Sequence, residues 1–142
     1  MPWEARVKAK AVIFKALGYN PSPPQRLVHF SSNRERLVTG GERSGKSFMG
    51  AKEVVGECPL GDLYWIVGPN YELARPEFDY VVKDLIKLDA VYPESLSFPR
   101  EGPCSVTTIW GTQIVTKSSM DVEKLGSVAP DGILMTEAAQ HP

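Results

Sequence analysis

The chain of 142 residues has few cysteines, no long apolar run and almost no net charge. Its two cysteines, Cys58 and Cys104, lack the spacing of metal ligands, so we expect no disulfide and a reduced, cytoplasmic setting. The longest apolar runs, such as 11–14, are broken by charges within a few residues, so we expect no membrane anchor and no signal peptide. A net charge of −1 gives no overall attraction to nucleic acid, so any DNA contact must be local.

The sequence also has no internal repeat and no low-complexity segment. An apolar content of 42% and a charged content of 23% are typical of a soluble globular protein. The length allows one hydrophobic core and is too short for two ordinary domains. We therefore expect a single domain.

The segment 37–47 has the pattern of a short apolar strand, a glycine-rich loop and the start of a helix. Gly40, Gly45, Lys46 and Ser47 match the P-loop spacing in full. The glycines let successive backbone N–H groups converge on a β-phosphate, and the helix N-terminus adds a positive dipole. Lys46 is expected to reach the β- and γ-phosphates, and the Ser47 hydroxyl to coordinate Mg²⁺.

A chance glycine-rich turn is the alternative interpretation of this segment. The helix expected after the loop carries Phe48, Ala51, Lys52 and Val55 at i, i+3, i+4 and i+7. This stripe is able to pack on a sheet, with the stem of Lys52 along its edge. The strand, loop and helix together favour nucleotide binding.

The N-terminal segment 2–17 predicts an amphipathic helix that stops at Gly18. Its apolar face is expected to consist of Trp3, Val7, Phe14 and Leu17. The basic residues Arg6, Lys8, Lys10 and Lys15 occupy much of the remaining surface. We interpret them as a solvated face, with a DNA-facing role as the alternative.

The segment 19–25 contains three prolines and is expected to form a rigid loop. A glutamine on such a loop is able to present its amide to adenine, as a donor to N7 and an acceptor from the 6-amino group. Gln25 is therefore a candidate adenine contact. The alternative is that Gln25 opens a helix at 26–31.

Three further strands are expected after the P-loop. The apolar run 63–67 has the length of a buried parallel strand, and 106–110 with 113–116 resembles a hairpin turning at Gly111 and Thr112. A helix between them is expected to bury Phe78, Val81, Val82, Leu85 and Ile86, and a short helix is expected at 119–126.

The last expected strand, 133–136, ends at Glu137. An apolar strand that ends in an acid beside a P-loop is typical of a Walker B element. Thr136 stands where such an element normally has an aspartate, and it brings no charge to the Mg²⁺ shell. Asp131 lies at the other end of the strand, where a turn residue is expected.

In combination, these motifs resemble the N-terminal ATPase domain of the large terminase subunit, the motor that packages DNA in tailed bacteriophages. The resemblance runs from about Tyr19 to Gln140. It is carried by the proline-rich segment that ends at Gln25 and by 39–47, 65–71, 124–126 and 137–140. It implies an α/β, three-layer P-loop NTPase of the additional-strand catalytic Glu type, with a mostly parallel central sheet that is incomplete at its C-terminal end.

The resemblance also implies a division of the chain and a set of site residues. The helix would occupy 1–18, the adenine-side loop and helix 19–36, and the P-loop core 37–142, with a nuclease domain downstream. Glu137 would polarise the attacking water, and Arg43 would act at the γ-phosphate together with Lys46. The nucleotide-binding set would be Gln25, Gly40, Gly41, Glu42, Arg43, Ser44, Gly45, Lys46 and Ser47. The metal set would be Ser47, Glu137 and, weakly, Thr136.

ATP and Mg²⁺ are the implied substrate and cofactor, with hydrolysis coupled to translocation of double-stranded DNA. The implied partners are the portal, the small terminase subunit and further copies of the chain, in the host cytoplasm and transiently at the procapsid portal. Because the chain stops before a coupling strand, we expect it to be a fragment or a split gene product with little activity. Two alternatives remain open, another P-loop ATPase of helicase-like type and a nucleotide-binding assembly module without turnover.

Overall fold

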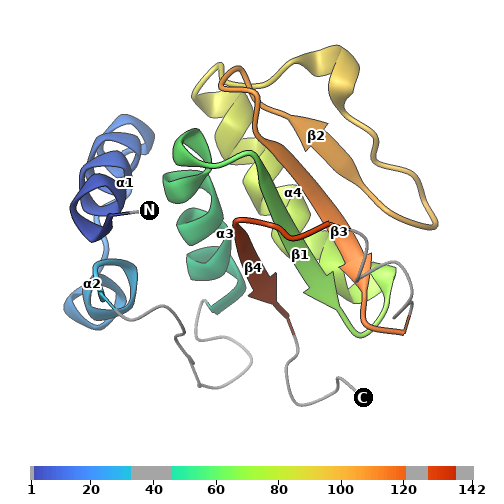
Figure 1. Ribbon diagram of the computed structural model, residues 1–142, viewed down its shortest axis with the longest axis horizontal. Helices are drawn as coiled ribbons and strands as arrows, with labels where there is room; N and C mark the ends of the chain where they lie inside the picture. The colour runs from blue at the N-terminus through green and yellow to red at the C-terminus, as the bar shows by residue number, and fades with distance from the viewer. Residues whose placement is uncertain (1, 33–45, 121–127, 137–142) are drawn as a thin grey trace.

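The computed structural model describes residues 2–32, 46–120 and 128–136 (Figure 1). The helices are α1 (Trp3–Leu17), α2 (Pro23–His29), α3 (Lys46–Glu57) and α4 (Tyr71–Lys87), with short 3-10 turns η1 (Cys58–Leu60) and η2 (Pro93–Ser95). The strands are β1 (Leu63–Gly68), β2 (Ser105–Thr107), β3 (Gln113–Ser118) and β4 (Gly132–Met135). The expected strand before the P-loop and most of the expected helix at 119–126 lie outside these residues.

The four strands form one sheet in the order β2-β3-β1-β4. Strand β1 pairs in parallel with β3 on one side and with β4 on the other, whereas β2 pairs with β3 in antiparallel orientation. The turn between β2 and β3 contains Gly111 at φ 86°, a conformation that glycine adopts without strain. The predicted α/β fold with a mostly parallel sheet, and the predicted hairpin, are confirmed.

The main core lies between helices α3 and α4 and one face of the sheet. Tyr64 and Ile66 of β1 and Ile114 of β3 point into it, next to Phe78 and Leu85 of α4. All five residues of β1 from Tyr64 to Gly68 are buried, as expected for a central parallel strand. On the other face, Ile133 and Met135 of β4 are 55% and 52% exposed.

Helix α4 follows β1 after a very tight connection. The Asn70 side chain accepts a hydrogen bond from the Leu73 N–H at 2.9 Å and caps the helix. A Cβ on Gly68 would come within 2.8 Å of the Ala74 nitrogen, so only glycine fits there. The predicted stripe is buried except for Ile86, which is 59% exposed because it lies beyond the edge of the apolar face.

Helix α1 ends as predicted at Gly18, which adopts φ 69° and closes the last turn. Its buried face differs in part from the prediction. Phe14 and Leu17 are buried, but Trp3 is 42% exposed and Lys10 is only 2% exposed. The interpretation of Lys10 as a solvated lysine is therefore wrong, and its partners are described below.

Helix α2 begins earlier than the sequence predicts. Pro23 and Pro24 occupy its first turn, where the missing proline N–H groups would have no partner within the helix. The rigid loop expected at 19–25 therefore ends at Ser22. The predicted loop is too long because proline, which breaks a helix in its interior, is compatible with the first turn.

Candidate functional site

Helix α3 begins at the edge of the sheet where the parallel strands end (Figure 1). A Cβ on Gly50 would lie 2.8 Å from a Leu134 methyl carbon, so the absence of a side chain lets α3 approach β4 closely. Lys46 and Ser47 form the first turn of α3, one turn before Gly50, and Lys46 is exposed to solvent. The helix thus places these two residues near the carboxyl end of β4.

Thr136 directly follows β4 at this edge and is 5% exposed. Its N–H donates to the Val67 carbonyl at 2.9 Å, which extends the pairing with β1. Its hydroxyl donates to the Leu73 carbonyl at 3.2 Å, in the first turn of α4. Thr136 therefore connects β4 to β1 and α4 through hydrogen bonds. It does so at the position where a Walker B element normally has a metal-binding carboxylate.

The ends of β1 and β3 are fastened together beside Thr136. The Ser119 N–H donates to the Gly68 carbonyl at 2.9 Å, and the Ser118 hydroxyl donates to the Pro69 carbonyl at 3.2 Å. Asp131 lies at the opposite end of β4 and accepts hydrogen bonds from the backbone N–H groups of Asp62 and Leu63 at 2.6 and 3.1 Å. Asp131 therefore lies away from the candidate site, as predicted, and connects the start of β4 to the start of β1.

Gln25 lies in the first turn of α2. Its side-chain oxygen accepts a hydrogen bond from the Ser22 N–H at 2.8 Å and forms a capping box. This is the helix-opening role that the sequence left as the alternative. Contact with adenine stays a prediction for this residue.

The remaining predicted site residues lie outside the described part of the chain. They are Gly40, Gly41, Glu42, Arg43, Ser44, Gly45 and Glu137. Within the described ranges, no group of three or more His, Cys, Asp or Glu side chains is arranged to hold a metal ion. No helix in those ranges is long and apolar enough to cross a membrane.

The expected stripe of α3 is only partly directed at the sheet. Phe48 is 38% exposed and packs edge-on against Tyr19 and Tyr80, with ring centroids 5.8 and 5.7 Å away. Lys52 is buried and forms an ion pair with Asp84 of α4 at 2.8 Å. The sequence placed the stem of Lys52 along the edge of the apolar stripe but did not foresee that its ammonium group lies between Asp84 and the rings of Tyr19 and Phe48.

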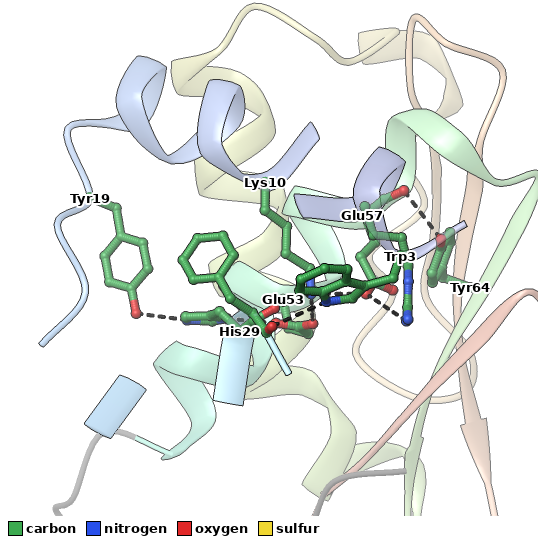
Figure 2. A network of polar contacts seen from close by, with 9 residues as sticks. Trp3, Lys10, Tyr19, His29, Glu53, Glu57 and Tyr64 are labelled. Carbon is green, nitrogen blue, oxygen red and sulfur yellow. Dashed lines mark hydrogen bonds and ion pairs between the residues drawn. The ribbon is translucent and has the colours of Figure 1, made fainter. Parts of the chain in front are cut away.

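A cluster of polar side chains between α1, α2 and α3 was not predicted (Figure 2). We call it the α3 clamp, and it consists of Lys10, Tyr19, His29, Glu53 and Glu57. His29 is fully buried and Lys10 nearly so. The sequence signal was the position of Lys10, which lies four and seven residues before the buried Phe14 and Leu17.

Burial also changes the acidity of two groups around α3. The pKa of Tyr19 is raised to about 12 by desolvation and by the Glu53 charge. The pKa of the Cys58 thiol is raised to about 12, chiefly by desolvation. Both Cys58 and Cys104 are free, buried thiols, so neither has the environment of a reactive cysteine.

No family model matches the chain. Two curated proteins do, the terminase large subunits of Thermus phage G20c and of Thermus virus P23-45. Each is 33% identical over 90 residues, which are 62% of this chain and 19% of the relative. The chain thus spans about a fifth of the length of these relatives.

Solved structures give the same result for the fold. The large terminase ATPase domain of Thermus phage P74-26 superposes with a TM-score of 0.73 and 25% identity, over 91% of this chain and 58% of that one. A mutant of that domain gives a TM-score of 0.69 at 24% identity, with the same coverage. The chain is therefore similar, in sequence and in fold, to the ATPase domain of the phage large terminase subunit, and the resemblance indicated by its motifs is confirmed.

Proposed function

We propose that this chain is the ATP-binding and ATP-hydrolysing module of a large terminase subunit that drives viral DNA packaging. The observation that supports this most strongly is the juxtaposition of two elements. The helix that starts with Lys46 and Ser47 lies against β4, the strand that leads to Glu137. A phosphate-binding helix beside a strand that ends in an acid is the arrangement that P-loop ATPases require.

In this proposal the phosphates are bound by 40–47, with Lys46 at the β- and γ-phosphates. Glu137 orients the attacking water, and Arg43 offsets the charge that develops on the γ-phosphate. Gln25 contacts the adenine through the side-chain amide nitrogen, because its oxygen already accepts the Ser22 N–H. These roles come from the motif and from the resemblance.

The predicted metal ligands, Ser47, Glu137 and Thr136, fit a Mg²⁺ ion that is held mainly by the nucleotide. Mg²⁺ usually keeps several waters and takes one or two protein oxygens together with phosphate oxygens. The Ser47 hydroxyl would be such a ligand, and Glu137, which follows β4, would be the second. The ion would neutralise phosphate charge, whereas Thr136 would contribute only weakly because its hydroxyl, unlike a carboxylate, carries no charge.

Double-stranded DNA, the portal and the small terminase subunit would be partners of the whole protein, which would act as a homo-oligomer at the procapsid portal in the host cytoplasm. The names of the relatives and the fold support this assignment. A nucleotide-binding assembly module without turnover is the second candidate. It is favoured by the backbone engagement of Thr136 at the position of a metal-binding aspartate, and a steady-state ATPase assay separates the two candidates.

Lys46→Ala tests the nucleotide site. The variant should lose at least about tenfold in ATP affinity, because the fixed cation at the phosphates is removed. Titration calorimetry with Mg²⁺ and ATP measures this loss, and Lys8→Ala, at an exposed lysine of α1, is the matched control. Equal affinities of the two variants would contradict the P-loop assignment.

A further inference from the structure

The α3 clamp connects three helices through one chain of polar contacts (Figure 2). Lys10 of α1 donates to the His29 carbonyl at the end of α2, at 2.5 Å, and also to a Glu53 carboxylate oxygen of α3. The other Glu53 oxygen lies 2.6 Å from His29 Nδ1. His29 Nε2 in turn lies 2.9 Å from the Tyr19 hydroxyl. Every link in this chain is within hydrogen-bond distance.

The contacts fix the hydrogen positions on a neutral His29. A carboxylate only accepts hydrogen bonds, so Nδ1 carries the proton and donates to Glu53. Nε2 then accepts from the Tyr19 hydroxyl. The imidazole is therefore held in one tautomer and one orientation between the 19–22 connection and α3.

Lys10 also neutralises two acidic residues that lie one turn apart on α3. Its ammonium group is 3.0 Å from Glu57 as well as bonded to Glu53. Helix α1 is able to approach this closely because a Cβ on Gly56 would be only 2.9 Å from the Lys10 side chain. Without the lysine, two carboxylates would face each other in a partly buried site, which is costly.

The clamp links the two ends of the proposed nucleotide site. His29 is one helical turn after Gln25 on α2, and Glu53 is two turns after Lys46 on α3. Tyr19, which hydrogen bonds to His29, also packs against Phe48 in the first turn of α3. The clamp therefore connects the helix that carries Gln25 to the helix that starts with Lys46.

We propose that the α3 clamp is a positioning device that holds α2 against α3 and thereby sets the affinity for the nucleoside part of the nucleotide. The proposal rests on the proposed function. In the proposed site the phosphates are bound by 40–47, and α3 is held independently of the clamp by the ion pair between Lys52 and Asp84 of α4. Loss of the bond between His29 and Glu53 should therefore leave phosphate binding unchanged. The base contacts α2, whose position depends on the bond between His29 and Glu53.

The experiment compares two ligands, Mg-ATP and Mg-tripolyphosphate, by titration calorimetry on the whole chain. His29→Gln removes the donor at the Nδ1 position, and we expect the Kd for ATP to rise about tenfold while the Kd for tripolyphosphate changes less than about twofold. His29→Asn places an amide N–H near the Nδ1 position, so it should restore most of the ATP affinity. If His29 only stabilised the fold, both dissociation constants would change by the same factor.

Ile13→Val is the matched control, because Ile13 is a buried residue of α1 outside the clamp. It should reduce stability without changing the ratio of the two dissociation constants. If His29→Gln does not fold, Tyr19→Phe decides, since it removes one hydroxyl and keeps the ring. It should raise the Kd for ATP about threefold, again without changing that for tripolyphosphate.

Equal changes for both ligands, or no change for either, would overturn the positioning role while leaving the proposed function intact. Failure of the parent chain to bind either ligand would instead overturn the proposed function, and the positioning role with it. The proposal would also be overturned if the ratio of the two dissociation constants shifts as much in Ile13→Val as in His29→Gln. Destabilisation alone would then explain the shift.

Discussion

The contacts of α1 with α3 and those of α4 with the sheet differ in their side chains. Those of α4 are apolar, whereas those of α1 include a buried cluster of charged groups. Phe78, Val81 and Leu85 of α4 are fully buried in the apolar core beside β1 and β3. Helix α1 also buries Ile13, Phe14 and Leu17 in this core, but it adds a buried lysine that neutralises two glutamates of α3. Apolar burial is non-directional, whereas hydrogen-bonded charges require one geometry. The comparison indicates that apolar burial supplies stability and that the charged contacts fix the positions of α1 and α2 on α3.

The largest effect is expected in the apolar contact. Phe78→Ala should reduce the free energy of unfolding by about 3–5 kcal/mol, since it removes a fully buried ring and leaves a cavity. Chemical denaturation measures the loss. Ile86→Ala, at an exposed position of the same helix, should cost far less. Similar losses for the two variants would show that α4 is not held by this packing.

Lys10→Met should have a somewhat smaller effect, about 3 kcal/mol, because Glu53 keeps His29 and Glu57 keeps Arg6 at 3.7 Å, and both glutamates retain some solvent contact. Lys8→Met, at an exposed lysine of α1, is the control and should change little. Adding Glu53→Gln to Lys10→Met should recover part of the loss, since it removes one of the two facing charges. A double variant that is less stable than Lys10→Met would contradict the role of charge in this contact.

The smallest effect is expected from alkaline pH. The pKa of Tyr19 is raised from 10.0 to about 12 in the folded chain, so its contribution to stability is complete below about pH 10 and is lost as the pH rises to about 12. Cys58 adds a similar loss that starts near pH 9, from within the apolar core. Tyr19→Phe should therefore flatten the fall of the unfolding free energy above pH 10 and leave the Cys58 part. If Tyr19→Phe and the parent chain have the same pH profile, the ionisation of Tyr19 does not affect stability in this range.

The elements around the apolar core were predictable because their signals are local. The buried run of β1, the stripe of α4 and the turn at Gly111 each appear within a few neighbouring residues. The α3 clamp was not predictable in the same way, because Lys10 and Glu53 are 43 residues apart and each reads as a surface residue by itself. Gln25 illustrates the same limit, since its capping bond to Ser22 depends on where α2 begins.

The residues of the candidate site also divide into those with local sequence signals and those whose contacts lie far away in the sequence. The first turn of α3 and the end of β4 were placed correctly at one edge of the sheet, because the order of strand, loop and helix in this class of fold constrains them. The backbone contacts of Thr136 were not foreseen. Their acceptors, the carbonyls of Val67 and Leu73, belong to elements that lie far away in the sequence and whose approach depends on the small size of Gly68.

The contacts of Thr136 have a mechanical consequence. Its N–H and hydroxyl fasten the end of β4 to β1 and to the first turn of α4, so these three segments form one stiff joint. A rotation of α4 must either carry the joint with it or break the bond to Leu73. A displacement of the first turn of α4 would therefore act directly on Thr136, the residue that precedes Glu137 in the chain.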